Sequence, residues 1–477
     1  MSQAPLEALA AIAPQHGRAW LVGGAVRDEL LGRETVDFDL AFDGDVEKLA
    51  RALGRASAGH AFSLSDTFGA WRVKAREGSW QVDVTPLAGD TVEEDLARRD
   101  LTINAIARPV GPGTPTRGIE LVDPFDGVAD LGVRRLRMVS PESFSSDPLR
   151  TLRLVRLAVE LDFEVDRLTA QAASASAPEL RAVAQERVFA ELCQIVSADR
   201  AVAGLQLMER IGAAQVVLPE LVALNGVQQS DYHHLDVHDH TLAVLAQVIE
   251  VERDLGRVFG SCGDAVGSVL AEPLANELTR GGALRFGALL HDIAKARTRS
   301  IGESGRVSFY GHDVVGVEMT MEILGRLRAS ERLIAHVGAL TRHHLRLGFL
   351  VHRRPLPPRA IYDYLAACEP VEVDVTVLSV ADRLATLGRN ANRAIEAHLD
   401  LAQEMIPKAL AWRTSRPSPP IRGDVIAREL DITPGPLLGM LLEELTIAAY
   451  AGEVQTEEQV VAYARAWLAA RGPVVDQ

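Results

Sequence analysis

The feature that most constrains the fold of this chain is a change of hydrophobic pattern near Ser145. Before it, strand-like and helix-like segments alternate, with strands expected at residues 19–22, 38–42 and 80–84 and short helices at 25–31 and 45–53. After it, apolar residues recur almost throughout at helical spacing to about residue 405, beginning with Leu149, Leu152, Val155 and Val159. The pattern predicts an α+β fold, with a mixed head followed by a mostly α-helical remainder.

A chain of 477 residues is too long for one ordinary domain. A Gly/Pro-rich hairpin or loop is expected at residues 111–118, and the proline-rich stretch 416–420 is typical of a linker. We therefore predict four parts: a head, a helical neck, a larger helical domain and a small helical tail, at residues 1–138, 139–222, 223–405 and 406–477.

The composition narrows the class of protein. A net charge of −15 argues against a general nucleic-acid coat, so an RNA partner would require a local concentration of positive charge. No apolar run reaches the roughly 18–20 residues that span a bilayer, and the N-terminus lacks a signal-peptide layout. The three cysteines form no CxxC pair. We expect a cytoplasmic protein with no membrane partner; the oligomeric state stays open.

A glycine turn, Gly23-Gly24, follows the first predicted strand, and Arg27 comes one turn into the next helix. Glycines at such a junction let backbone N–H groups approach phosphate oxygens, and the helix N-terminus adds favourable partial charge. Arg27 offers a forked donor for the same oxygens. The pattern alone also fits an ordinary turn.

Asp37 and Asp39 flank Phe38 on an apolar strand. Side chains two residues apart on a strand share a face, so both carboxylates point one way while Phe38 points to the core. Like charges this close need a cation, and Mg²⁺ prefers carboxylates with substrate phosphates and water. Asp83, on a neighbouring predicted strand, is a candidate third carboxylate. A solvated strand face is the alternative, but the preceding glycine turn favours a phosphoryl-transfer site.

A third segment is Arg98-Arg99-Asp100-x-Thr102-x-Asn104-Ala105. The three segments in this order resemble the class II tRNA nucleotidyltransferase (CCA-adding) and bacterial poly(A) polymerase family, which has a polymerase-β-like head. The resemblance spans roughly residues 18–450 and implies tRNA, CTP and ATP as partners and Mg²⁺ as cofactor. It implies that Asp37 and Asp39 hold Mg²⁺, that Gly24 and Arg27 hold the triphosphate, that Arg99 contacts the nucleotide, and that Asn104 supports the sugar or the site geometry. From the strand pattern we add Asp83 as the candidate third catalytic carboxylate, and from the glycine turn we add Gly23 to the nucleotide-binding residues.

Asp147, Arg150, Arg153 and Arg156 recur every three residues at the start of the helical region, so they form one slowly drifting stripe. Asp147 is predicted as the N-cap, with Pro148 as the first helical residue. Arginines without partners repel one another, which favours a polyanionic ligand. A solvated basic helix face is the alternative.

The resembling family reads the incoming base with this segment. The resemblance implies that Asp147 and Arg150 pair with the base edge, and that Arg153 and Arg156 bind nearby phosphates. C and A share an amino group beside an acceptor nitrogen, whereas U and G present the reverse, and one bidentate contact discriminates by about 1–3 kcal/mol. Residues 185–191 resemble the next family motif, which braces the neck helices.

Most of the 13 histidines fall between residues 233 and 344. Their order resembles the HD phosphohydrolase superfamily, which binds divalent metals. The resemblance implies a metal site for Mn²⁺, Ni²⁺ or Mg²⁺ formed by His240, His291, Asp292 and Asp382, with His312 and His344 placed for a second ion. A buried histidine is also often structural, so metal binding without catalysis is the alternative.

Only five residues separate Leu87 from Glu93, where full CCA-adding relatives carry a longer loop. This resembles the CC-adding subgroup, and full CCA addition stays an open alternative. An HD phosphohydrolase with an inactive head, and a non-enzymatic RNA-binding module, are the other classes. The tail around Gly435 and Gly439 resembles the family segment that grips the tRNA body, although a turn and helix start fits equally well.

Overall fold

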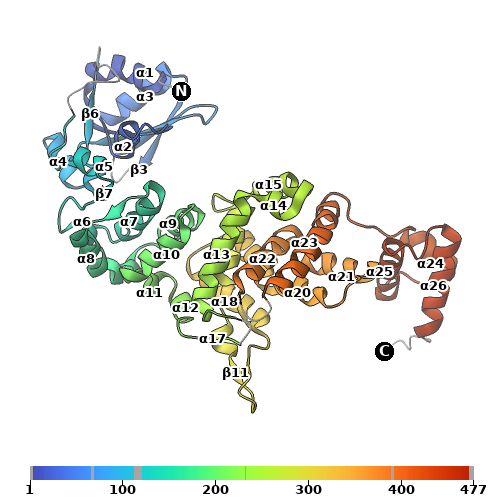
Figure 1. Cartoon of the computed structure of the whole chain (residues 1–477). Coiled ribbons are helices and arrows are strands. Elements are labelled where there is room, and N and C mark those ends of the chain that lie inside the picture. The colour runs from blue at the N-terminus through green and yellow to red at the C-terminus, as the bar shows by residue number, and fades with distance from the viewer. Residues whose placement is uncertain (1–3, 66–68, 112–120, 231–232, 388–390, 472–477) are drawn as a thin grey trace. The chain divides into compact units, whose positions relative to one another are not determined.

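The structure is a computed structural model that describes residues 4–65, 69–111, 121–230, 233–387 and 391–471. Its contacts divide the chain into two compact units, residues 1–217 and 218–477. Apart from Gly111, the loop predicted at 111–118 lies outside the described residues. The α+β class is confirmed, because the first unit carries the main sheet and the second is almost entirely helical (Figure 1).

The head is built on a six-stranded sheet in the order β3-β4-β5-β2-β1-β6. Its strands are β1 Gly17–Val22, β2 Asp37–Gly44, β3 His60–Ser65, β4 Ala70–Lys74, β5 Gln81–Pro86 and β6 Ala107–Val110. Within these described strands, β2 and β5 pair in parallel and the other neighbours pair antiparallel. The head helices are α1 Ala4–Ile12, α2 Gly24–Leu30, α3 Val46–Ala56, α4 Val92–Ala97 and α5 Gly127–Gly132.

Alternation fixes the faces of β2, because Phe38, Leu40 and Phe42 are buried while Asp37 and Asp39 stay more accessible. The carboxylate of Asp45 then accepts a hydrogen bond from the Lys48 N–H at 3.0 Å and begins α3, which packs on β3 and β4. The predicted strands and helices of the head are therefore present.

The neck completes the first unit. It contains β7 Arg135–Leu136, α6 Ser143–Ser146, α7 Arg150–Leu161, β8 Glu164–Val165, α8 Arg167–Ser176, α9 Gln185–Ser197, α10 Ala201–Arg210 and α11 Ala214–Val217. The predicted N-cap of α7 is wrong: the helix begins at Arg150 with Leu149 as N-cap, and Asp147 ends α6. Asp147 still caps locally, because its carboxylate accepts from the Leu149 N–H at 3.2 Å.

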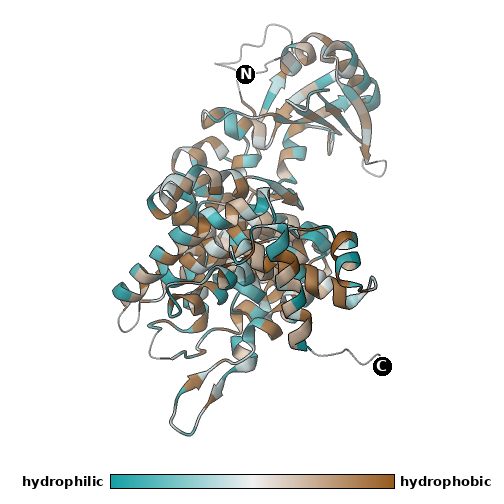
Figure 2. Cartoon of the chain, turned by 90° about the vertical axis from the view of Figure 1, so that its right-hand side faces the viewer, coloured by the Kyte–Doolittle hydropathy of each residue, from teal (hydrophilic) through white to brown (hydrophobic). Residues whose placement is uncertain are grey.

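The second unit is a helical assembly with two small hairpins, β9 Pro273–Ala275 with β10 Leu278–Thr279 and β11 Ser300–Ile301 with β12 Val307–Ser308. Its helices up to the proline-rich linker are α12 Pro219–Val222, α13 Val237–Arg253, α14 Leu255–Phe259, α15 Gly263–Leu270, α16 Arg280–Leu290, α17 Lys295–Thr298, α18 His312–Arg326, α19 Glu331–His343, α20 Arg346–Val351, α21 Pro358–Cys368, α22 Glu372–Ala385 and α23 Ala391–Thr414. Most helices interleave hydrophobic and hydrophilic residues (Figure 2), as helices packed on one side require.

The tail consists of α24 Gly423–Leu430, α25 Pro436–Tyr450 and α26 Glu457–Arg471, packed around Ile426, Leu441 and Leu445. The proline-rich linker joins it to α23, which continues past the predicted boundary at 405. Gly435 is the N-cap of α25, so the turn and helix start expected there are present, and contact with RNA stays a prediction. None of the described helices combines the length and apolarity needed to cross a bilayer.

Candidate active site and metal centre

Gly23 brings the end of β1 against two charged groups of the head. Its φ of +71° lies where side chains rarely go, and a Cβ there would lie 2.8 Å from Arg99 Nη1 and 3.6 Å from Asp39 Oδ2. The backbone therefore favours a glycine here, and a larger residue would displace the Arg99 guanidinium. The space beside Gly23 lies between the Asp39 carboxylate and the Arg99 guanidinium. A carboxylate that can bind a metal and a guanidinium that can bind an anion together suit a metal-bound phosphate group.

The three predicted carboxylates lie on one face of the sheet. Asp37 and Asp39 are two apart on β2, and the parallel register places Asp83 of β5 directly beside Asp39. Burial raises the pKa of Asp39; Arg99 opposes this, and the charges of Asp83 and Asp37 add to it. The carboxylates thus repel one another, and a cation would relieve that repulsion.

Arg72 of β4 holds Asp83, which the sequence did not reveal. Arg72 Nε donates to Asp83 Oδ1 at 2.6 Å and Nη2 donates to Oδ2 at 2.7 Å. Both oxygens of the candidate third carboxylate are therefore engaged by one guanidinium. A register argument could have found this pair, because Arg72 and Asp83 face each other across β4 and β5.

The remaining nucleotide-contact candidates form a buried network. Arg27 is only 7% exposed; its guanidinium binds the neighbouring Asp28, and its Nη1 donates to Asn104 Oδ1 at 2.9 Å. Asn104 Nδ2 in turn donates to Asp100 Oδ1 at 3.0 Å. Arg99 is braced by Asp95 at 3.1 Å. The structure brings these residues together, with Arg99 nearest the carboxylates.

The arginine stripe is not unpaired, contrary to the prediction. Arg153 lies 3.3 Å from the buried Asp100, and Arg156 Nε donates to Glu191 Oε2 at 2.8 Å. These two partners lie on the head and on α9, where spacing within one helix could not reveal them, whereas a third contact, from Arg156 to Glu160 at 3.3 Å, lies within α7 itself. Burial opposes ionisation of Asp100, yet Arg153 and the Asn104 hydrogen bond hold its pKa below the usual value.

Arg150, the first residue of α7, and Asp147, which ends α6 just before it, are the predicted base-reading pair. Asp147 Oδ2 is 3.2 Å from Arg187 of α9. Arg150 donates to the carbonyl oxygen of Arg98 at 2.7 Å and to that of Ser143 at 3.0 Å. These contacts with Arg187, Ser143 and Arg98 fix the orientation of both side chains. The hydrogen bond to Arg98 also links the stripe to the head.

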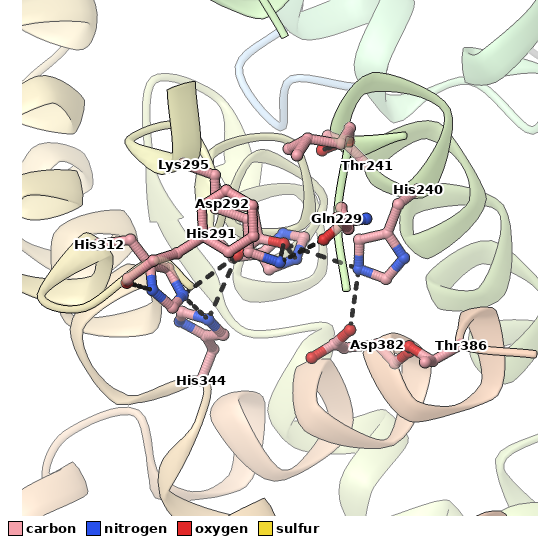
Figure 3. Close-up of polar contacts among 12 residues, drawn as sticks. Gln229, His240, Thr241, His291, Asp292, Lys295, His312, His344, Asp382 and Thr386 are labelled. Atoms are coloured by element: carbon pink, nitrogen blue, oxygen red, sulfur yellow. Dashed lines mark hydrogen bonds and ion pairs between the residues drawn. The ribbon is translucent and has the colours of Figure 1, made fainter. Parts of the chain in front are cut away.

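In the second unit, the structure brings all six predicted metal ligands together around Asp292 (Figure 3). They come from α13, the turn after α16, the start of α18, the end of α19 and α22. His291 Nε2 lies 3.1 Å from Asp292 Oδ2, His312 Nε2 lies 3.3 Å from Oδ1, and His240 Nε2 lies 3.1 Å from Asp382 Oδ1. Ligand atoms from five segments thus converge on one centre.

Main-chain hydrogen bonds fix the histidine rings. The Nδ1 atoms of His291, His312 and His344 lie 2.7–2.8 Å from the carbonyl oxygens of residues 288, 309 and 341. With Nδ1 as the donor, each Nε2 presents its lone pair to the centre. His240 Nε2, His291 Nε2 and Asp292 Oδ1 are buried without a hydrogen-bond partner among the described residues. Orphaned nitrogen and oxygen atoms that converge in this way fit a divalent metal.

Lys295 and Gln229 belong to the same centre, and sequence reasoning assigned neither a role. Lys295 Nζ lies 2.7 Å from Asp292 Oδ2 and donates to Gln229 Oε1 at 2.7 Å. Burial alone would raise the pKa of Asp292, but His291 and Lys295 hold it well below its usual range. The lysine could have been found, because it follows Asp292 by one helical turn.

Within the described ranges, three groups of histidine and acidic side chains have ligand atoms within 4.8 Å of one another. Two are the halves of the centre around Asp292: His240, His291 and Asp382, and Asp292, His312 and His344. The third lies at the start of α13, where Asp236 is the N-cap. The head carboxylates Asp37, Asp39 and Asp83 are not among these groups. Arg72 binds both carboxylate oxygens of Asp83.

Three family models match successive parts of the chain: the poly A polymerase head domain at residues 19–137, the probable RNA and SrmB-binding site of polymerase A at 162–224, and the HD domain at 237–387. The fold is also that of a solved CCA-adding enzyme in its apo form I, with a TM-score of 0.65 and 20% identity, over 97% of this chain and 92% of that one.

Curated relatives match nearly end to end. An A-adding tRNA nucleotidyltransferase of Deinococcus radiodurans is 34% identical over 94% of this chain and 95% of its own length. A CC-adding tRNA nucleotidyltransferase of Thermus thermophilus is 33% identical over 95% of this chain and 94% of its own. The similarity includes head and neck, which favours nucleotide addition over an HD phosphohydrolase with an inactive head. The chain belongs to the tRNA nucleotidyltransferase family.

Proposed function

We propose that this chain adds cytidines from CTP to the tRNA 3′ end and stops before the terminal adenosine. The observation that carries the proposal is the short connection between β5 and α4, residues 87–91. It is tied at both ends, because the Ala88 N–H donates to Asp95 at 3.1 Å and the Asp90 N–H donates to Glu94 at 2.9 Å. A connection so short and so anchored leaves little freedom to reshape the site for a second base.

The similar proteins do not decide between products. The relatives from Thermus thermophilus and Geobacter sulfurreducens are named CC-adding and cover 95% and 96% of this chain. The relative from Deinococcus radiodurans is named A-adding. Addition of A alone, or of the whole CCA, is therefore an outcome that the test must be able to report.

The head residues suggest how the transfer proceeds. The 3′-hydroxyl of the tRNA attacks the α-phosphorus in line and pyrophosphate leaves, so one P–O bond forms as another breaks. Asp37 and Asp39 would hold Mg²⁺, which stabilises the charge on the transferring phosphoryl group. The Gly23-Gly24 turn and Arg99 would hold the triphosphate, and Arg27 and Asn104 would keep this wall in place. The proposal goes with the cytoplasmic location expected from the sequence.

Base choice is assigned to Asp147 and Arg150. The carboxylate of Asp147 can accept from the cytosine amino group, and Arg150 can donate to the ring acceptors beside it. To do so, Asp147 exchanges its contact with Arg187 for the base. The remaining arginines of the stripe already have carboxylate partners, so we assign Arg153 and Arg156 to bracing the neck.

Two experiments test this function. Transcripts ending at the discriminator base, at C and at CC are incubated with CTP, ATP or both, and the products are sized at single-nucleotide resolution. Addition of two cytidines followed by arrest is expected; efficient A addition to the CC transcript would refute CC-only activity. In Asp147→Ala, the rate of UTP misincorporation relative to CTP incorporation should then rise by roughly 5–150-fold over wild type, the equivalent of about 1–3 kcal/mol of lost discrimination. Unchanged fidelity would remove Asp147 from base choice.

A second candidate function, metal-dependent phosphate-ester hydrolysis, is favoured by the unpartnered nitrogens and oxygen around Asp292 among the described residues. A divalent metal there, Mn²⁺, Ni²⁺ or Mg²⁺, would polarise a phosphate ester. Lys295 would hold the charge of Asp292 in place, and the buried histidines would exclude bulk water. We expect phosphate release that depends on added metal. This release should be lost in His291→Ala and should survive in Asp39→Ala. Equal release by wild type and His291→Ala would exclude this site.

A further inference from the structure

Arg72, Asp83 and Asp39 form one row across three adjacent strands of the head. Arg72 on β4 faces Asp83 on β5, and Asp83 faces Asp39 on β2. Neighbouring strands lie about 4.8 Å apart, so the backbone of Arg72 is roughly 10 Å from that of Asp39. Register partners point to the same face, which places the guanidinium beside the carboxylates proposed to hold Mg²⁺.

The contact between Arg72 and Asp83 is a two-pronged ion pair in a half-buried setting. The two hydrogen bonds measure 2.6 Å and 2.7 Å, and the side chains are 28% and 18% exposed. Arginine forks of this geometry are among the strongest carboxylate partners in proteins. The hydrogen bonds that Arg72 donates to Asp83, together with the charges of Asp83, Asp37 and Asp39, raise the pKa of Arg72, so all three carboxylates act on it.

We propose that Arg72 competes with the divalent cation in the head, holding Asp83 when the cation is absent and weakening cation binding at Asp37 and Asp39. The inference rests on the proposed function of the head. The three carboxylates share their face of the sheet with Arg72, and the charges of Arg99 and Arg153 also act on Asp39. Loss of Arg72 removes a positive charge near the cation and frees both oxygens of Asp83, so both effects act in one direction.

The test measures Mn²⁺ binding rather than activity, by titration calorimetry and by electron paramagnetic resonance of free Mn²⁺. The full chain carries His291→Ala and Asp292→Ala, which remove one ligand from each of the two groups that make up the centre of the second unit. Asp39→Ala in that background identifies the head sites. Arg72→Met keeps the aliphatic stem and removes the charge, whereas Arg72→Lys keeps the charge.

A matched control is available in the same sheet. Arg18 of β1 faces Asp43 of β2 in register and binds it at 2.7 Å, towards the opposite end of β2 from Asp37 and Asp39. Arg18→Met therefore removes one charge and one cross-strand pair without touching the site. Binding in this variant should stay within about twofold of the parent, because exposed charges at a distance are screened.

Arg72→Met should bind Mn²⁺ at the head at least about tenfold more tightly, and Arg72→Lys should stay near the parent. Equal or weaker binding in Arg72→Met, with an unchanged melting temperature, would overturn the inference and leave the proposed function intact. Equal tightening in Arg72→Met and Arg72→Lys would also overturn it, since the charge would then be irrelevant. Identical binding by the parent and Asp39→Ala would refute the metal role of the head itself, and the inference with it.

Discussion

Gly23→Ala separates the two reasons for the glycine before α2. The backbone at Gly23 has φ +71° and ψ −134°, a region that costs a side chain of order 1–3 kcal/mol. The added Cβ would also meet Arg99 Nη1 at 2.8 Å. The guanidinium is the end of a flexible side chain, so it can move, but it then leaves the space beside Gly23 where the triphosphate is proposed to lie.

Gly32→Ala is the matched control. Gly32 has φ +69°, and a Cβ there would meet no described atom within 4 Å, so only the backbone cost of about 1–2 kcal/mol applies. Urea denaturation gives the stability of both variants, and CTP titration of the transfer reaction gives KM. Both variants should lose stability by similar amounts, while only Gly23→Ala should raise KM for CTP, by about tenfold or more if a charge-assisted contact of roughly 1.5–3 kcal/mol is displaced.

Equal KM values in the two variants would refute this reasoning, because the approach of Arg99 to Gly23 would then have no bearing on nucleotide binding. An unchanged KM for CTP in Arg99→Ala would refute it as well, since the guanidinium would then make no contact with the triphosphate.

Three further outcomes are expected. Asp374→Asn should cost about 3–5 kcal/mol in urea unfolding, because it leaves the buried Arg280 without its carboxylate; a loss below about 1 kcal/mol would contradict this. Burial opposes ionisation of Asp374, but His336 and Arg280 hold its pKa below the usual value. The ionised carboxylate therefore contributes its full stabilisation of the folded state above about pH 4, and the difference in unfolding free energy between wild type and Asp374→Asn should narrow as the pH falls further. Arg156→Ala should lower stability by about 1–3 kcal/mol while KM for CTP stays within about twofold, and a larger KM change would return this arginine to a phosphate-binding role. In Asp39→Ala, which lacks a proposed head ligand, Mn²⁺ should raise the melting temperature through the second unit; adding His291→Ala should reduce that rise as measured by differential scanning fluorimetry, and an undiminished rise would point to other ligands.

Local periodicity was enough to predict the faces of the head. The alternation around Phe38 placed Asp37 and Asp39 together, and the predicted strand holding Asp83 proved to be their neighbour. What periodicity could not give was the register between strands, which decides that Arg72 lies opposite Asp83. Pairing across strands depends on turns and packing that no single segment encodes.

The arginine stripe shows the same limit in helices. Spacing correctly placed Arg153 and Arg156 on one line of α7, but their partners, Asp100 and Glu191, lie in other elements. A helix pattern describes one surface and not what covers it. The centre around Asp292 was predicted far better, because histidines are rare and several fell into motifs whose order was informative. Lys295 was overlooked, since a lysine is normally solvent-exposed.

The histidine anchors of the second unit have a consequence for how this centre tolerates mutation. Each of three rings is held by a carbonyl oxygen three positions earlier, and the residues that supply it are Ala288, Phe309 and Thr341. A main-chain oxygen is present whatever side chain a position carries. The side chains at these three positions can therefore change without altering which histidine nitrogen faces the centre. The ring orientation is set by the backbone spacing of three residues between each histidine and its carbonyl partner. The residues around the histidines can therefore change while the ligand atoms keep facing the centre.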